Sequence, residues 1–283
     1  MTNPTPDPAQ LDRYQQIALQ AVSIGTRTLA DAHGPGRITD KTDRDIVTET
    51  DFHVQQAVMH HLSAATPETV FLGEEQTGQI ADDALTQITP IEFGDAPLAW
   101  VLDPIDGTSN YAHGIPLHAV SLALACFGEP VVAVTAIPAL NTTYHAIRGG
   151  GAFCNNQPTR VRNTTDLRKA IISINDYATG DNAETKNQRR LAITAALIPA
   201  VERIRMFGAA TIDLAFVAAG LTDAAILDTN KPWDTAAGVL LAREAGATVT
   251  DLNGHPHTAT GASTLAAAPA IAAQLTQLTA QPR

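Results

Sequence analysis

The sequence predicts a mixed protein of helices and sheets, either α+β or layered α/β. Apolar residues recur at helical spacing over residues 11–29 and from 51 to about 65. Short apolar runs that end at Gly or Asp predict strands at 69–72 and 99–102. An antiparallel meander is predicted from three successive strand-like segments, at 118–127, 131–137 and 142–147.

The first half of the chain contains most of the predicted strands. Residues 1–10 are polar and rich in Pro at their start, so we expect a disordered lead-in. Gly and Pro punctuate the polar stretch 34–45, which predicts a loop. Residues 76–97 are acidic and show no clear pattern, and three glycines at 149–151 predict a flexible turn. We treat residues 11–155 as an N-terminal α+β half.

The second half, residues 156–283, continues the mixed pattern and is expected to form a C-terminal α/β half. Short apolar runs predict strands at 170–174, 224–227 and 247–250. Apolar residues at helical spacing predict helices at 184–198, 211–221, 234–245 and 264–279. The last of these segments is rich in Ala and is expected to close the fold as a single helix.

The charge balance excludes several classes of partner. The 283 residues include 29 Asp and Glu against 18 Lys and Arg, which gives a net charge of −11. Binding to nucleic acid requires an excess of basic residues, so we expect no nucleic acid partner. No apolar run approaches the roughly 18 residues of a membrane span, and no basic cluster suits a membrane surface. We therefore expect no membrane partner.

Two further signals concern the cellular compartment. The N-terminal residues lack a basic region followed by an apolar stretch, which argues against a signal peptide. Cys126 and Cys154 are too few for a disulfide framework, and we expect both to be reduced. Together these signals predict a cytoplasmic protein.

Two aspartates three positions apart give the strongest chemical signal. The strand at 99–102 is expected to stop at Asp103, because Pro104 cannot continue it. A turn there directs the carboxylates of Asp103 and Asp106, and with them the Ile105 carbonyl, toward one point. Neighbouring carboxylates repel one another unless a cation lies between them. Hard oxygen ligands of this kind suit Mg²⁺.

Other acids follow apolar runs or precede predicted helices: Asp51, Glu74, Glu75 and Asp234. Each has an ordinary interpretation as a turn residue, a surface acid or a helix N-cap. Their placement along the chain is nevertheless the one that a layered fold would bring to a single edge. Gly107 and Thr108 are expected to open a helix, whose free N–H groups are suited to a phosphate.

Several motifs resemble those of the inositol monophosphatase family. The central one is WVLDPIDGTSNY at 100–111; the others are DIVTETD at 45–51, LGEE at 72–75, GGGAFCN at 149–155 and KPWDTAAG at 231–238. The resemblance runs from about residue 11 to 270, and the order of the motifs makes it specific. It implies a lithium-sensitive, Mg²⁺-dependent phosphatase. The implied fold is the layered αβαβα sandwich of the inositol monophosphatase/fructose-1,6-bisphosphatase type.

The resemblance also implies a role for each matching residue. The implied metal ligands are Glu74, Asp103, the Ile105 carbonyl, Asp106 and Asp234, with Asp103 bridging two ions and a weaker third ion near Glu74. The implied catalytic residues are Asp51, Glu74 and Thr108, of which Asp51 and Thr108 would orient the attacking water. The implied substrate contacts are Asp106, Gly107, Thr108, Gly208, Ala209, Ala210 and Asp234.

Three departures from the family pattern concern the substrate. Many members that act on inositol carry a Glu seven residues before the last metal-binding Asp, where this chain has Leu227. Asp228 follows, but a shift of one residue along a strand reverses the direction of the side chain. The stretch 76–98 is longer than usual, and Lys41 lies about one position later than the usual Lys.

These features predict a phosphomonoesterase with two or three Mg²⁺ ions that hydrolyses a small polyol or sugar phosphate. Inositol 1-phosphate is the first candidate; histidinol phosphate, fructose 1,6-bisphosphate and adenosine 3′,5′-bisphosphate are alternatives. A regulatory binding module with the same fold is a further alternative, although such a module would not need four converging acids. The resemblance also favours a homodimer.

Overall fold

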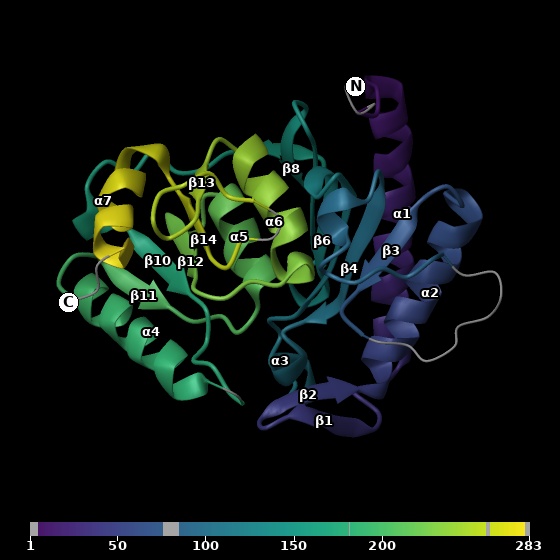
Figure 1. Ribbon diagram of the computed structural model, residues 1–283, viewed down its shortest axis with the longest axis horizontal. Coiled ribbons are helices and arrows are strands. Elements are labelled where there is room, and N and C mark those ends of the chain that lie inside the picture. The colour runs from purple at the N-terminus through teal and green to yellow at the C-terminus, as the bar shows by residue number, and fades with distance from the viewer. Residues whose placement is uncertain (1–4, 76–84, 181, 259–260, 281–283) are drawn as a thin grey trace.

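The helices and sheets alternate in five layers, as Figure 1 shows. The computed structural model describes all residues except 1–4, 76–84, 181, 259–260 and 281–283. From one side to the other, the layers are a helix pair, a seven-stranded sheet, a second helix pair, a five-stranded sheet and a third helix pair. This arrangement confirms the αβαβα sandwich that the sequence predicts.

The first helix pair covers one face of the larger sheet. It consists of α1 (Pro8–Asp31) and α2 (Glu49–Ala65). The sheet, in spatial order, contains β3 (Val70–Gly73), β4 (Ala99–Asp106), β5 (Ala119–Cys126), β6 (Glu129–Ile137), β7 (Thr142–Ile147), β8 (Gly151–Cys154) and β9 (Gln157–Thr159). Only β3 and β4 are parallel neighbours, and the remaining pairs are antiparallel, which confirms the predicted meander. Alternate residues of β4 face opposite layers, so Trp100 packs toward α1 and α2 while Val101 packs toward the middle helices.

The middle helices lie between the two sheets. They are α5 (Ala210–Ala218) and α6 (Pro232–Glu244), and every residue of α5 after Ala210 is buried. The smaller sheet has the order β11 (Arg203–Arg205), β10 (Ile171–Ile174), β12 (Ala224–Leu227), β14 (Thr264–Ala267) and β13 (Thr248–Thr250). The outer helices α4 (Ala183–Leu197) and α7 (Pro269–Ala280) cover its far face. A helix buried between two sheets needs apolar residues on all sides, which explains why α5 lacks a polar stripe.

Short elements complete the described chain. The hairpin strands β1 (Ile38–Thr42) and β2 (Asp45–Thr48) form a separate sheet, and α3 (Thr108–Ala112) follows β4. Single 3₁₀ turns lie at Phe93–Asp95, Pro138–Leu140 and Leu167–Lys169. Both cysteines are free, as expected. None of the helices in the described ranges has the length and apolar character needed to cross a bilayer.

The predicted loop at 34–45 is wrong, because the hairpin β1–β2 occupies most of it. Strand β1 is largely exposed and carries Thr39, Asp40 and Lys41 instead of alternating apolar residues, while β2 is buried only at Val47 and Thr48. A strand without a buried face gives no period-two hydrophobic signal. The hairpin therefore forms through backbone pairing that the sequence pattern does not reveal.

The predicted end of the strand at 99–102 is also wrong. Strand β4 continues through Pro104 to Asp106, and the pairing with β5 shifts register between Asp103 and Asp106. At such a bulge the missing N–H of a proline is tolerated, because no ladder hydrogen bond is required there. The two aspartates consequently stand on either side of a bulge at the end of a fully buried strand.

Three further differences lie in the second half and at its border. The segment predicted as one helix at 264–279 is strand β14 followed by α7, with Pro269 at the first position of the helix. Strand β11 was not predicted. The turn at 149–151 is present, but the sheet continues beyond it into β8 and β9.

The sheet topology bears on where the proposed N-terminal and C-terminal halves meet. Because β9 still belongs to the larger sheet, we propose that the halves meet in the connection at 160–170 instead of at 155. Helix α1 already begins at Pro8, where the Asp7 side chain accepts a hydrogen bond from the backbone N–H of Gln10. Residues 1–4 of the expected lead-in lie outside the described residues.

Close packing of α5 against α6 depends on Gly238. A Cβ atom at this position would lie 2.5 Å from the Cβ of Leu214. We expect Gly238→Ala to lower the free energy of unfolding by about 1–3 kcal/mol through overpacking. Gly94→Ala is the matched control, because a Cβ at Gly94 meets no atom within 4 Å. Urea titration of both variants tests this, and equal stability would contradict the packing role.

Candidate active site

The site is built around the end of β4. Asp103 and Asp106 are both buried there, and the Ile105 carbonyl between them accepts a hydrogen bond from Thr108 Oγ1 at 3.0 Å. Gly107 turns the chain with φ +82°, and a Cβ at this position would lie 2.9 Å from the Leu117 carbonyl oxygen. Glycine is therefore required for the turn that starts α3.

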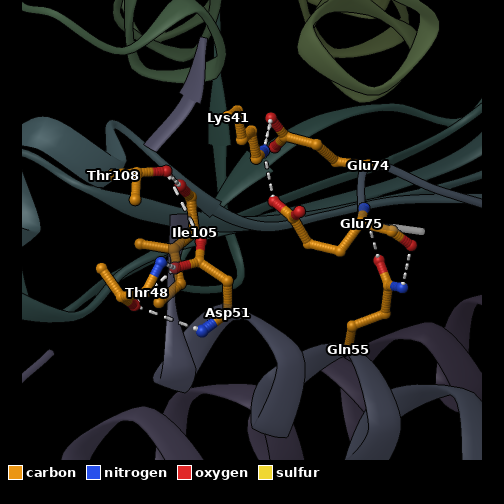
Figure 2. A network of polar contacts seen from close by, with 8 residues as sticks. All are labelled: Lys41, Thr48, Asp51, Gln55, Glu74, Glu75, Ile105 and Thr108. Carbon is orange, nitrogen blue, oxygen red and sulfur yellow. Dashed lines mark hydrogen bonds and ion pairs between the residues drawn. The ribbon is translucent and has the colours of Figure 1, made fainter. Parts of the chain in front are cut away.

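Asp51 enters the site from the first turn of α2. Its carboxylate accepts hydrogen bonds from the Thr48 backbone N–H at 2.9 Å and from the Thr48 hydroxyl at 2.5 Å, while Thr48 caps the helix. The other carboxylate oxygen of Asp51 lies 3.5 Å from Thr108 Oγ1. Helix capping thus fixes Asp51 beside the end of β4, as Figure 2 shows.

A lysine lies between the two glutamates that follow β3. Lys41 Nζ is 2.9 Å from Glu74 Oε1 and 2.5 Å from Glu75 Oε1. Gln55 on α2 holds the backbone of Glu75 in both directions, donating to its carbonyl at 2.6 Å and accepting from its N–H at 3.1 Å. Figure 2 shows the Lys41 ammonium group between the two glutamate side chains, so strand β1 supplies a cation to the acids that follow β3.

The middle helices supply the remaining side of the site. The Asp106 carboxylate accepts hydrogen bonds from the backbone N–H of Ala210 at 3.2 Å, and from the N–H of Thr211 at 2.7 Å and its hydroxyl at 2.5 Å. Asp234 stands in the first turn of α6, where its carboxylate accepts from the Lys231 backbone N–H at 3.2 Å. The N-termini of α5 and α6 therefore face these acids, which their helix dipoles favour.

The acids are held at the cost of strong mutual repulsion. Burial, reinforced by Glu74, Asp106 and Asp234, raises the pKa of Asp103 well above its usual range. Burial with the same kind of repulsion raises the pKa of Asp234 to about 8. For Asp106, burial outweighs the hydrogen bonds from Thr211 and raises the pKa to about 6.

The pKa values of Asp51 and Glu75 are raised for the same reason. Burial, with Glu74 adding repulsion, raises the pKa of Asp51 to about 6 despite the hydrogen bonds from Thr48. Burial also raises the pKa of Glu75 to about 7, and Lys41 only partly opposes it. Burial would lower the pKa of Lys41, but Glu74 and Glu75 outweigh it and raise that pKa above its ordinary value.

The donor set fits a hard divalent cation. Asp103 Oδ1 is buried and has no hydrogen-bond partner in the described part of the chain. A positive charge beside this oxygen would relieve the repulsion among Asp103, Asp106 and Asp234. Across the described ranges, however, no three acid, His or Cys side chains are arranged so that they could hold an ion as they stand. Because Glu74 is paired with Lys41, a cation shared with Glu74 would require that ion pair to open.

Some of the residues that were expected to contact the substrate already have partners within the protein. Gly208 has φ +73° and precedes the N-terminus of α5, while the N–H of Ala210 is already directed at Asp106. Leu227 is 1% exposed and packs in the core between the middle helices and the smaller sheet. The neighbouring Asp228 forms ion pairs with Arg189 at 3.1 Å and Arg190 at 3.7 Å. Leu227 therefore has no acceptor to offer, and the Asp228 carboxylate is buried and ion-paired with the two arginines, although its Oδ1 forms no hydrogen bond with the described residues.

Sequence reasoning did not assign site roles to Thr48, Gln55 or Thr211. Thr48 and Thr211 each place a hydroxyl on an acid of the site, and Gln55 fixes the backbone of Glu75. Thr48 could have been found, because Thr three residues before Asp51 at a helix start is the capping-box pattern. Thr211 is 105 residues from Asp106, and no local pattern connects them.

The layered fold and its buried carboxylate cluster define a phosphatase, an enzyme that hydrolyses phosphomonoesters. The sequence profile described as the inositol monophosphatase family matches residues 10–282, so the chain belongs to this family. The family is generally metal-dependent, which agrees with the chemistry of the acids at the end of β4. A phosphatase of this kind acts on a small phosphorylated substrate.

Relatives and solved structures support this placement. The inositol-1-monophosphatase ImpA of Mycolicibacterium smegmatis is 36% identical over 265 residues, which cover 94% of this chain and 91% of that protein. A fructose-1,6-bisphosphatase/inositol-1-monophosphatase of Thermotoga maritima is 34% identical, with 75% of this chain and 73% of that protein covered. The crystal structure of the extragenic suppressor protein suhB from Bartonella henselae has a TM-score of 0.83 and 31% identity, and covers 95% of this chain and 98% of its own.

The raised pKa values predict how the stability of the metal-free protein depends on pH. Each shifted acid binds its proton more tightly folded than unfolded, so the stabilisation is complete below the unfolded pKa of about 4 and is lost as pH rises through the folded values. We expect the melting temperature of the metal-free protein to fall between about pH 5.5 and pH 8.5. Asp103→Asn should weaken this dependence.

Added MgCl₂ should raise the melting temperature more at the upper end of that range than at the lower end, because the cation binds the ionised carboxylates. KCl at matched ionic strength is the control. Differential scanning calorimetry measures both effects. A melting temperature that rises with pH, or a response to MgCl₂ no larger than that to KCl, would contradict the assignment of these acids.

Proposed function

We propose that this protein is a Mg²⁺-dependent phosphomonoesterase that hydrolyses a small polyol or sugar phosphate, with inositol 1-phosphate as the first candidate. The observation that carries the proposal is the Asp103 carboxylate, which is buried near four other acids (Asp51, Glu74, Asp106 and Asp234) and has one oxygen without a hydrogen-bond partner among the described residues. The family membership and the similarity to inositol-1-monophosphatase ImpA support the reaction class.

The acids at the end of β4 would hold two or three Mg²⁺ ions. Glu74, Asp103 and the Ile105 carbonyl would hold the first ion, and Asp103, Asp106 and Asp234 the second. A third, weaker ion would lie near Glu74. Bound Mg²⁺ supplies an acidified water and neutralises charge on the phosphoryl and leaving oxygens. The ions would also make the pocket locally positive on a protein of net charge −11, which an anionic ester requires.

Thr108 and Asp51 would orient the attacking water. The Thr108 hydroxyl has a single proton, which it donates to the Ile105 carbonyl at 3.0 Å or to Asp51 at 3.5 Å. Its lone pairs are then free to accept a hydrogen bond from water. The same water can pass its proton through Thr108 to Asp51 as its oxygen attacks phosphorus and the ester P–O bond breaks, and a second water would protonate the departing alkoxide. The N–H groups of Gly107 and Thr108 would hold phosphate oxygens.

Three other phosphate esters are alternative substrates of the same site. Histidinol phosphate and adenosine 3′,5′-bisphosphate would use the same acids, and fructose 1,6-bisphosphate is named in a 34% identical relative from Thermotoga maritima. We also propose that the enzyme is inhibited by lithium, forms a homodimer and lies in the cytoplasm. A regulatory binding module is disfavoured, because four acids packed together at such electrostatic cost serve no purpose in a binding scaffold.

Phosphate release with Mg²⁺ from these four esters tests the reaction class. Asp103→Asn should lower kcat/KM by about 10³-fold or more, because charge stabilisation by the bridging carboxylate is worth several kcal/mol. Asp12→Asn, an exposed acid on α1, is the matched control and should leave turnover unchanged. Full activity of Asp103→Asn would refute its role, and the absence of release from every ester would refute the phosphatase proposal.

The water-orienting role predicts a graded response at position 108. Thr108→Val keeps the shape of the side chain but removes the hydroxyl, and we expect kcat to fall about 10²-fold with a small change in KM. Thr108→Ser keeps the hydroxyl and should stay close to the wild type. Steady-state kinetics on inositol 1-phosphate measures both, and equal kcat values for the two variants would contradict the role of the hydroxyl.

A further inference from the structure

The side of the site that would contact the leaving group lacks the expected acid on β12. Leu227 lies in the core, and the Asp228 carboxylate is paired with two arginines of α4. A polyol ester nevertheless presents hydroxyl groups that need acceptors once they leave water. An acceptor for them must come from another element.

Asp176, just after β10, lies beside the segment that opens α5. A Cβ atom at Gly208 would lie 3.3 Å from Asp176 Oδ2 and 3.0 Å from Asn110 Nδ2, so these three residues meet at one point. Two residues further on, Ala210 donates its N–H to Asp106. Asp176 and Asp106 therefore both lie beside the short segment from Gly208 to Ala210 that leads into α5.

A buried group on α5 lies within electrostatic reach of both acids. Asp213 is completely buried, and its pKa is raised by burial first and then by the charges of Asp106 and Asp176. This agrees with the contacts at Gly208 and Ala210, which place Asp176 and Asp106 along the same short segment at the start of α5.

The loop that carries Asp176 is held rigidly by hydrogen bonds from α4 and the end of β12. The Arg190 guanidinium donates to the backbone carbonyl of Asp176, and its other nitrogen donates to the Thr229 hydroxyl at 2.7 Å. Asn187 bonds both the N–H and the carbonyl of Ala178, at 2.6 and 3.0 Å. These contacts fix the backbone of the loop, while the Asp176 carboxylate interacts with Arg190 only through its charge.

The carboxylate itself is exposed and makes no hydrogen bond or ion pair with the described residues. It would repel a phosphate group, so it is unsuited to the transferred group. It is suited to a neutral hydroxyl, which donates one hydrogen bond to a carboxylate. A carboxylate on a fixed loop accepts such a bond without first having to be ordered.

We propose that Asp176 accepts a hydrogen bond from a hydroxyl group of the leaving group and so selects esters of polyhydroxylated alcohols. This proposal rests on the proposed phosphatase function and assigns a substrate class to it. The absence of a side chain at Gly208 lets the Asp176 carboxylate lie directly against the backbone that leads into α5, because a Cβ there would come within 3.3 Å of Asp176 Oδ2. Arg190 acts as a positioning residue, because it holds the Asp176 backbone without touching the carboxylate.

A matched pair of esters tests this assignment. Inositol 1-phosphate and cyclohexyl phosphate share a six-membered ring, but only the first carries free hydroxyls. We expect Asp176→Ala to lower kcat/KM for inositol 1-phosphate by about 10- to 100-fold, mainly through KM, because a hydrogen bond to a charged group is lost. Turnover of cyclohexyl phosphate should change by less than about 2-fold. Asp176→Asn keeps an acceptor oxygen and should fall between Asp176→Ala and the wild type.

Glu184→Ala is the control for the lost negative charge, because Glu184 is an exposed acid in the first turn of α4. It should leave both esters unchanged. Equal losses on both esters, or no loss on inositol 1-phosphate, would overturn the assignment while leaving the phosphatase function intact. If Asp176→Ala lowers kcat/KM more for an aminoalkyl phosphate than for inositol 1-phosphate, the assignment is also overturned. Asp176 would then bind an ammonium group of the substrate instead of a hydroxyl group. A wild-type protein that releases phosphate from no ester would overturn both proposals.

Discussion

Electrostatic repulsion among buried carboxylates is the constraint on which the rest of this structure depends. Asp103, Asp106 and Asp234 are held together at the junction of the larger sheet and the middle helices, where burial alone already disfavours their ionised forms. Two features of the protein itself reduce this repulsion. Helix N-termini and Thr211 donate hydrogen bonds to the acids, and Lys41 lies between Glu74 and Glu75. The remaining deficit of positive charge is what a divalent cation would supply.

The five layers serve this arrangement by delivering groups from distant parts of the chain to one edge. Strand β4 brings Asp103 and Asp106, α2 brings Asp51, and α6 brings Asp234. Two glycines make the close approach feasible. Gly107 allows the turn after β4, and Gly238 lets α6 pack directly against α5, which fixes both helix N-termini relative to the acids. Loss of packing in the middle layer would therefore disturb the site without touching any of its acids.

Different residues would contact the two ends of the proposed substrate, the phosphate and the leaving group. The phosphate end would meet the acids and helix N-termini at the end of β4, in a family that is generally metal-dependent. The leaving-group end would meet Asp176, on a loop that Arg190 and Asn187 hold in place, while Leu227 is buried in the core. In these proposals, reaction class depends on the larger sheet and substrate choice on the smaller one. Such a division allows specificity to change while the reacting centre is kept.

The sequence by itself determined the layered fold, the central meander and the acids of the site, because periodicity, turn residues and motif order are local properties of the chain. It misjudged the β1–β2 hairpin, the bulge at Pro104 and strand β14, whose formation depends on partners elsewhere in the chain. Only the tertiary structure decided that Thr211 donates to Asp106, that Lys41 pairs with Glu74, and that Asp228 pairs with two arginines while Asp176 lies beside Gly208. The physical reason is that burial and charge pairing are set by residues far apart in sequence, which no local pattern encodes.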